Sequence, residues 1–313
     1  MVISWISVAL AAYLFLAVAN LFDKFLIDHI IGSARAYTFF ACIMGAIVIL
    51  ASPWLLKWPG WFYFIVNIAL GGVFVLALWS LYEALKRGEA ARILVLVGGT
   101  TPIFSIILSM AFLKECFSVS QWFGLAFLLL GVFIIAFLPT HRSFLSRLLR
   151  HLKIKQIVGA NGLWLAIFSG LAYSIYFVGS KYAFSHQAFA SAFIWNRLGA
   201  ALFALLFLLK AGSRCEIKKF ARKSSPSKHK FLVVLGQGLG SLGFILQNYA
   251  VSLGSVALIN ALQGVQYAFI LVISTILALS LPRLLKETFS WRILLQKTAA
   301  VTMVGIGLYF IAF

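Results

Sequence analysis

The feature that most constrains this chain is a series of apolar stretches, each about twenty residues long. Ten of them are present, at 3–22, 36–56, 61–85, 91–113, 120–138, 161–180, 188–209, 231–251, 255–281 and 293–313. A helix of this length spans the hydrocarbon core of a bilayer, and helices satisfy their own backbone hydrogen bonds where lipid offers none. The sequence therefore predicts an all-α integral membrane protein with about ten transmembrane helices.

The composition supports this prediction and argues against a soluble protein. Hydrophobic residues make up 63% of the chain and charged residues only 11%, whereas soluble domains have roughly 45–50% and 25%. The first stretch lacks a basic leader and is longer than the apolar core of a cleavable signal peptide, so we expect a retained first helix. The predicted location is the cytoplasmic (inner) membrane, with multiple passes.

The positive charges are distributed unevenly along the chain, which has a net charge of +19. Of its 26 Lys and Arg residues, 22 lie in or beside the connections that follow the odd-numbered stretches. Positive loops are retained in the cytoplasm. This distribution therefore predicts that both termini lie outside and that the basic loops face anionic lipid headgroups. The basic segment 218–230 is interpreted as a solvated loop and not as a nucleic-acid site.

The chain also carries an internal repetition. Lys114-Glu115-Cys116-Phe117-Ser118 follows the fourth stretch, and Lys286-Glu287-Thr288-Phe289-Ser290 follows the ninth. We expect one five-helix repeat at 1–140, a basic connecting loop at 141–160 and a second repeat at 161–313. Because five is odd, the second copy must enter the membrane from the opposite side. Inverted repeats of this kind are typical of secondary transporters, whose substrate site lies near the midplane between the halves.

Several short motifs occur in the order and spacing of a known family. They are Ala84-Leu85, Thr101-Pro102, Lys114-Glu115 and Gly124 to Gly131, together with Lys24, Lys181 and Arg197. With them the chain resembles the ten-helix, EamA-type members of the drug/metabolite transporter superfamily over nearly its whole length. The second copy departs from the pattern, with Tyr267-Ala268 in place of Thr-Pro. Many ten-helix members of this superfamily place both termini in the cytoplasm. The resemblance therefore implies the opposite orientation from the charge distribution, which places both termini outside.

A glycine-rich segment fits the template of a dinucleotide-binding turn. The residues are Gly238-Leu-Gly240-Ser-Leu-Gly243, but the template requires a preceding strand and an acidic residue about 20 positions later. Neither is present. Gly236, Gly240 and Gly243, spaced by four and three residues, are instead predicted to lie on one helical face and to let a neighbouring helix approach closely. An intramembrane enzyme would need paired aspartates or a histidine site at depth. The sequence predicts no enzymatic activity, no metal and no cofactor.

Polar side chains within the apolar stretches are the candidates for a substrate site. Gly98 to Pro102 is predicted to interrupt the fourth helix, since proline removes a backbone donor. In the ninth, polar residues recur every three or four positions, which favours either a cavity lining or hydrogen bonds between helices. Arg197 is predicted to meet either a structural partner or an anionic substrate. The candidate substrate-binding residues are Trp79, Thr101, Tyr176, Arg197, Gln247, Asn260, Gln263 and Tyr267.

Two acidic residues, Glu83 and Asp23, are candidates for proton coupling, because a carboxylate at membrane depth usually faces a cavity or a cation. The alternative for Glu83 is an ion pair with Lys86 or Arg87 at the helix end.

Together these features predict a secondary transporter of small organic metabolites or drugs, with amino acids among the candidate substrates. It would work by alternating access, coupled to protons or to exchange, since no phosphate-binding GxxxxGK[ST] loop is present. The alternative is a lipid-linked sugar flippase of the same superfamily. The expected partners are a small-molecule substrate and membrane lipids but no nucleic acid, and the chain would be a monomer or homodimer.

Overall fold

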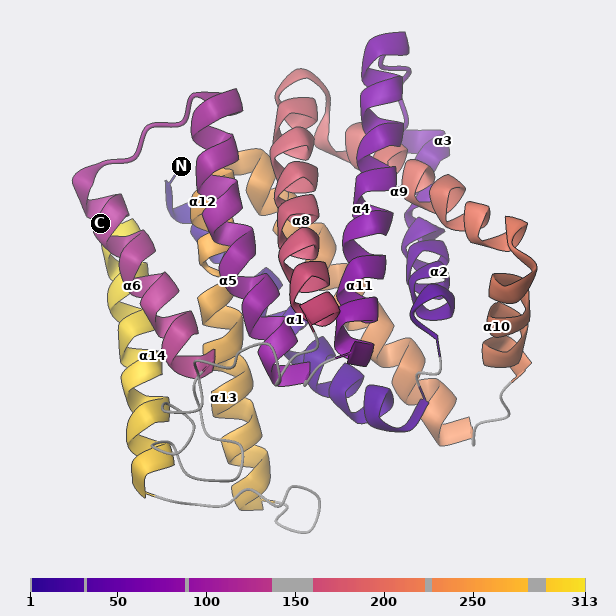
Figure 1. The fold of residues 1–313 in the computed structure, drawn as a ribbon. Coiled ribbons are helices and arrows are strands. Elements are labelled where there is room, and N and C mark those ends of the chain that lie inside the picture. The colour runs from indigo at the N-terminus through magenta and orange to yellow at the C-terminus, as the bar shows by residue number, and fades with distance from the viewer. Residues whose placement is uncertain are drawn as a thin grey trace.

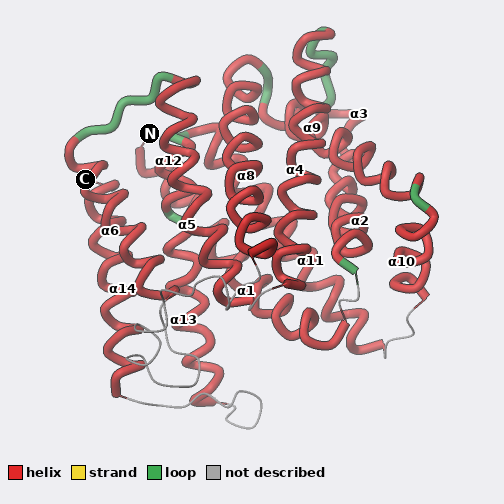
Figure 2. The backbone as a smooth tube through the Cα atoms, in the orientation of Figure 1, coloured by secondary structure: helices red, strands yellow, loops and turns green. Residues whose placement is uncertain are grey.

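The computed structural model describes residues 2–30, 33–87, 90–136, 160–222, 227–280 and 291–312. Every regular element in these ranges is a helix (Figures 1 and 2). Five helical segments there are long and apolar enough to cross a membrane, at 34–55, 61–87, 96–113, 162–186 and 189–209, and shorter apolar helices accompany them. The predicted class, an all-α integral membrane protein, is confirmed.

The first half contains the helices that the apolar stretches predicted. They are α1 (Val2–Ile30), α2 (Ala34–Gly45), α3 (Ser52–Leu55), α4 (Trp61–Arg87), α5 (Ala90–Leu108) and α6 (Val119–Ala136). A 3₁₀ segment, Ala46–Ala51, joins α2 to α3, so together they form the second span. A π segment, Ser109–Leu113, continues α5.

The second half has corresponding helices and one further helix. They are α8 (Ala160–His186), α9 (Phe189–Leu205), α10 (Ala211–Arg222), α11 (Ser227–Leu253), α12 (Val256–Ala261), α13 (Gln263–Ser280) and α14 (Trp291–Ala312). A 3₁₀ segment, Leu206–Leu209, extends α9. The predicted ninth span is divided into α12 and α13.

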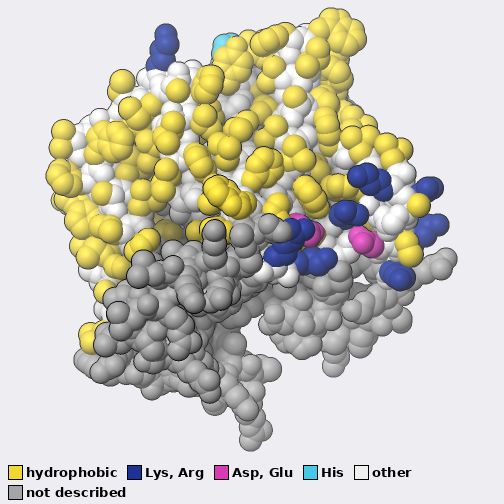
Figure 3. Space-filling model, viewed as in Figure 1, with side chains coloured by type: hydrophobic (Ala, Val, Ile, Leu, Met, Phe, Trp, Pro, Cys, Tyr) yellow, Lys and Arg dark blue, Asp and Glu magenta, His cyan; other side chains and the backbone are white. Residues whose placement is uncertain are grey.

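The helices cross between two ends of the molecule (Figure 1). We call them the α10 end, where α4 finishes and α5 begins, and the α12 end, where the N-terminal residues of α1 and the C-terminal residues of α14 lie. Large apolar side chains such as Leu50, Trp54 and Phe112 are 74–81% exposed, which suits a surface that contacts lipid. Lys and Arg side chains gather at the α10 end (Figure 3). The orientation derived from them stays a prediction.

The helices of the two halves pack reciprocally. α1 packs along α11 and α4 packs along α8, while α6 pairs with α14. If α1 corresponds to α8 and α4 to α11, the first contact maps onto the second, and the α6–α14 contact maps onto itself. This is the packing that an internal two-fold relation would produce. The repeat boundaries remain a prediction.

Glycines allow several close approaches between helices. In α11 the prediction holds at Gly243, whereas a Cβ atom at Gly240 would make only an ordinary contact, 3.5 Å from the Cβ atom of Ala19. A Cβ atom at Gly243 would lie 3.0 Å from the carbonyl oxygen of Ala12 in α1. Between α4 and α9 the approach is closer still. A Cβ atom at Gly71 would lie 2.3 Å from the amide nitrogen of Ala200.

The predicted interruption at Gly98 to Pro102 is wrong, because α5 runs through these residues without a break. The hydroxyls of Thr100 and Thr101 donate to the carbonyls of Leu96 and Val97, both at 2.7 Å, and thereby pair carbonyls in the turn before the proline. The actual interruption lies in the second half, at Leu262, between α12 and α13. There the hydroxyl of Tyr13 donates to the carbonyl of Ile259 at 2.6 Å.

The interpretation of segment 218–230 as a solvated loop is also wrong. Residues 218–222 belong to α10, and residues 227–230 begin α11. Ser213 and Ile217, four residues apart on α10, are buried, whereas Lys218 and Lys219 are exposed. This separation of faces is typical of a helix that lies along a surface.

Candidate functional site

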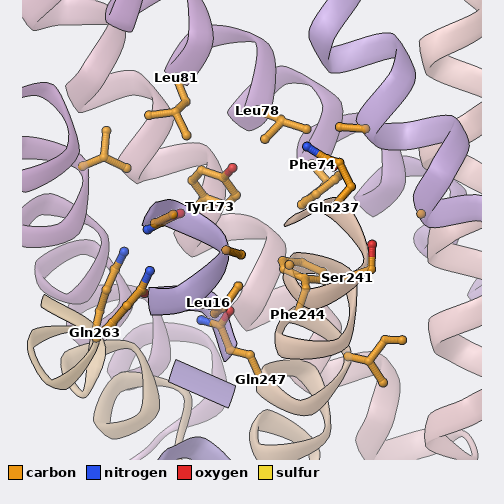
Figure 4. A pocket seen from close by; sticks show the side chains of 18 of the residues that line it. Leu16, Phe74, Leu78, Leu81, Tyr173, Gln237, Ser241, Phe244, Gln247 and Gln263 are labelled. Carbon is orange, nitrogen blue, oxygen red and sulfur yellow. The ribbon is translucent and has the colours of Figure 1, made fainter. Parts of the chain in front are cut away.

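A cavity of about 250 Å³ lies between the two halves of the bundle (Figure 4). This volume is just below the roughly 300–1,000 Å³ of pockets that hold drug-sized ligands. Helices α1, α2, α4 and α5 line it from the first half, and α8, α9, α11 and α13 from the second. The lining residues of α5 are Leu94, Val97 and Thr101, so the cavity extends from the interior toward the α10 end.

Arg197 of α9 lies in the wall of this cavity and is only 5% exposed. Its Nη2 donates to the hydroxyl of Tyr176 at 2.9 Å, while Nε is buried without a partner among the described residues. The sequence predicted a structural partner or a substrate anion. The structure supplies a neutral hydroxyl in place of a carboxylate.

Four aromatic rings surround this guanidinium. Its Cζ lies 4.1 Å from the ring centre of Phe74, 4.7 Å from Phe244, 5.2 Å from Phe193 and 5.7 Å from Tyr176. Rings within about 6 Å stabilise a cation through their electron-rich faces, by roughly 0.5–2 kcal/mol each depending on solvation. The rings therefore offset part of the cost of burying the charge but leave Nε without a hydrogen-bond partner among the described residues.

A second group of polar side chains, the glutamine cluster, consists of Gln247, Gln263 and Gln266. Gln247 donates to the hydroxyl of Tyr13 at 3.3 Å, and this tyrosine in turn donates to the carbonyl at the end of α12. Gln263 and Gln266 line the cavity without a side-chain hydrogen bond to any described residue. In Figure 4, Gln247 and Gln263 approach the cavity from different helices.

Tyr267 and Thr101 lie beside this cluster and link the two halves. The Tyr267 hydroxyl donates to the carbonyl of Leu94 in α5 at 2.8 Å. Its ring rests on Gly98, where a Cβ atom would meet the hydroxyl at 2.1 Å. The glycine that the sequence assigned to a helix break therefore makes room for this tyrosine.

The cavity has a third polar region, formed by α11 and α2. Gln237 donates to the hydroxyl of Tyr37 at 2.6 Å, and Tyr37 packs edge-on against Tyr82 with ring centres 4.6 Å apart. Ser241, one turn after Gln237, also lines the cavity. Gln237 and Ser241, four residues apart on α11, therefore lie on the same face of this helix.

The structure brings most of the candidate substrate-binding residues to this cavity. Those in its lining are Thr101, Arg197, Gln247, Gln263 and Tyr267, and those outside the lining are Trp79, Tyr176 and Asn260. Tyr176 accepts a hydrogen bond from Arg197. Asn260 donates to the hydroxyl of Ser105 at 2.8 Å and so joins α12 to α5. Trp79 has a buried Nε1 atom with no partner among the described residues. Their roles in binding remain predictions.

The two proton-coupling candidates are placed differently. Glu83 is outside the cavity lining, and its carboxylate accepts from Nη2 of Arg87 at 2.8 Å and from Nε at 3.2 Å. This is the helix-end ion pair that the sequence offered as the alternative. Asp23 belongs to α1, but its side chain lies outside the described residues.

At the α12 end the halves are joined by hydrogen bonds that sequence reasoning did not anticipate. Glu115, just after the π segment, accepts from the hydroxyl of Ser255 at 2.6 Å and from the backbone amide of Val256 at 3.3 Å. A carboxylate at a helix start is favoured by the unpaired amides and the helix dipole. Within the second half, Lys181 Nζ of α8 donates to the carbonyl of Ser252 in α11 at 3.1 Å.

Comparison with known proteins adds to this geometry. Residues 3–137 match the sequence model of the EamA-like transporter family. Over these residues the chain is similar to EamA-like transporters. The resemblance that the motifs gave to the drug/metabolite transporter superfamily is thereby confirmed, and the all-helical bundle is consistent with an EamA-type membrane protein.

The likeness of fold to a solved structure extends beyond the matched residues. A solved structure titled "Crystal structure of protein" is similar over 97% of this chain and 96% of its own, with a TM-score of 0.64 and 18% sequence identity. At that identity the likeness concerns the fold alone. No curated protein matches the chain.

Proposed function

We propose that this chain is a secondary transporter that moves a small organic metabolite or drug across the cytoplasmic membrane by alternating access. The observation that carries the proposal is the cavity between the halves, where polar side chains from otherwise apolar helices converge. Polar groups at membrane depth are costly unless they face protein, water or a solute. A membrane protein with a purely structural role would not need the amides of the glutamine cluster to face a cavity.

The packing supports alternating access as the mechanism. Hydrogen bonds of Glu115 with Ser255 and Val256 hold the halves together at the α12 end, whereas the lining extends toward the α10 end. In the proposed cycle these contacts break while the α10 end closes around the same site. The inverted arrangement of two similar halves makes two such states close in energy.

The first experiment screens solutes by thermal stabilisation of the purified chain. Amino acids, sugars, nucleotides, organic acids and cationic drugs form the panel, because a ligand at 100 times its Kd stabilises the folded state by about 2.7 kcal/mol. Stabilising compounds are then tested, radiolabelled, for uptake into proteoliposomes. The proposal fails if stabilising compounds bind but do not cross. Competition by lipid-linked sugars, but not by free solutes, would favour the flippase.

A matched pair of variants connects flux to the cavity. Gln263→Ala removes an amide from the lining, whereas Gln121→Ala removes one that accepts from the amide of Ser118 at the start of α6. We expect the first variant to reduce both binding and flux and the second to leave both near wild type. Equal effects of the two substitutions would refute the assignment of the site.

A further inference from the structure

We propose that the cavity selects organic acids and that Arg197 binds their carboxylate. This inference rests on the proposed function and adds a substrate class to it. The starting observation is a guanidinium that is 5% exposed, lies in the cavity wall, and has a single hydrogen bond to described residues, made to a neutral hydroxyl. A guanidinium remains charged in proteins, and a buried charge is stable only when it is paired.

The described acidic residues do not supply that pair. Glu83 is bound to Arg87, Glu115 caps the start of α12, and Glu216 accepts from the hydroxyl of Ser33 at the α10 end. Each of these carboxylates has a partner elsewhere, and none lines the cavity. Within the described lining, Arg197 is thus a positive charge without a negative one, which favours anions and opposes cations.

The guanidinium has donors left for a ligand. Nη2 serves Tyr176, but Nε is unpaired and Nη1 makes no hydrogen bond to the described part of the chain. Nη1 lies 3.8 Å from the position a Cβ atom would take at Gly45, which also lines the cavity. The missing side chain at Gly45 leaves space beside this nitrogen. The fork of an arginine matches the two oxygens of a carboxylate.

The surroundings define the rest of the ligand. Phe74, Phe193 and Phe244 line the cavity with ring centres 4.1–5.2 Å from the guanidinium, and they offer an apolar surface to the body of the molecule. They also exclude water, which strengthens an ion pair. The unpaired amides of Gln263 and Gln266 provide neutral hydrogen-bonding groups for its remaining polar atoms. A single arginine suits a monovalent carboxylate better than a phosphate, which carries about −2 charges.

The test compares acids with amides of nearly the same shape. Benzoate with benzamide, and indole-3-acetate with indole-3-acetamide, are titrated into the purified full-length chain by calorimetry and thermal shift. We expect each acid to bind at least tenfold more tightly than its amide. Arg197→Gln should abolish this preference and leave the weak binding of the amides unchanged, whereas Arg197→Lys should retain part of it.

Some outcomes overturn the inference. Equal affinity of acid and amide for the wild-type chain would do so, as would a preference that survives in Arg197→Gln or a failure of both acids to bind. If that variant does not fold, the wild-type comparison alone still decides, and Tyr176→Phe, which keeps the charge, gives a second measurement. In that variant the preference should persist with reduced affinity.

Uptake measurements separate this inference from the proposed function. If the acids bind but none enters proteoliposomes, transport fails while the carboxylate site stands. If neutral or cationic solutes are transported and the acids neither bind nor cross, transport stands and the carboxylate site is refuted.

Discussion

The contact between α4 and α9 allows a quantitative prediction about Gly71. A methyl group at this position would lie 2.3 Å from the amide nitrogen of Ala200 and 2.5 Å from the carbonyl oxygen of Asn196, whereas ordinary contacts begin at 3.4 Å. Since both neighbours are backbone atoms, no side chain can rotate away. We therefore expect Gly71→Ala to force the two helices apart by about 1 Å.

The cost follows from two opposing effects. Overpacking costs about 1–3 kcal/mol, and replacing a helical glycine by alanine returns about 0.5–1 kcal/mol. We expect a net loss of about 1–2 kcal/mol, measured as reversible unfolding in mixed micelles. Arg197 lies on α9 between Asn196 and Ala200, and Phe74 lies one turn after Gly71, so their 4.1 Å contact should also lengthen. The affinity for benzoate should fall in the folded variant.

Gly99→Ala provides the matched control. The same methyl group at Gly99, in α5, would meet nothing within 4 Å. This variant should be as stable as the wild type or more stable by up to about 1 kcal/mol. If Gly71→Ala proved as stable as Gly99→Ala, the close contact of α4 with α9 would be refuted.

Three further predictions test individual contacts. Glu115→Gln should lower the free energy of unfolding by about 1 kcal/mol, since a charged acceptor at a helix start is lost; adding Ser255→Ala should cost little more in thermal unfolding, and additive losses would contradict their contact. Tyr176→Phe should leave the fold intact but weaken benzoate binding several-fold in calorimetry, because the hydroxyl that orients the guanidinium is gone; unchanged affinity would remove it from the site. Glu83→Gln should leave the pH dependence of uptake unchanged, since its carboxylate is paired with Arg87 outside the cavity lining; loss of proton-driven uptake with intact exchange would instead give it the coupling role.

The spans were predictable because hydropathy is a local property. The third stretch was expected at 61–85 and α4 covers Trp61–Arg87. The first was expected to end at 22, but α1 continues to Ile30. A helix does not need an apolar sequence to continue once it leaves the hydrocarbon. Hydropathy therefore predicts the limits of the lipid-embedded segment more reliably than the first and last residues of the helix.

The helix interruption was not predictable from proline. Pro102 removes one backbone donor, yet α5 stays continuous through it, and the hydroxyls of the two preceding threonines bond carbonyls one turn earlier. The break at Leu262 has no proline or glycine at its position, and beside it the hydroxyl of Tyr13, 246 residues away in the chain, donates to the carbonyl of Ile259. Spacing identifies a polar face, whereas tertiary partners decide where the backbone departs from a helix.

The sequence singled out the cavity-lining residues that are polar within apolar stretches. It did not single out the aromatic residues that surround Arg197. Gln263 and Tyr267 stood out because amides and hydroxyls are rare at this depth. Phe74 and Phe244 gave no signal among 30 phenylalanines, although they flank the buried guanidinium. The sequence analysis did not predict α10, because this segment is rich in Lys and Arg. Its buried residues Ser213 and Ile217, four positions apart, gave only a weak helical pattern.

The reciprocal contacts of α1 with α11 and of α4 with α8 have a consequence for how such a chain can exist at all. Neither half covers its own largest faces, so a five-helix fragment made alone would leave them bare in the bilayer. Two such fragments could satisfy one another only by inserting in opposite directions. A gene for half of this protein would therefore have to produce both orientations, and joining two copies in one chain removes that requirement.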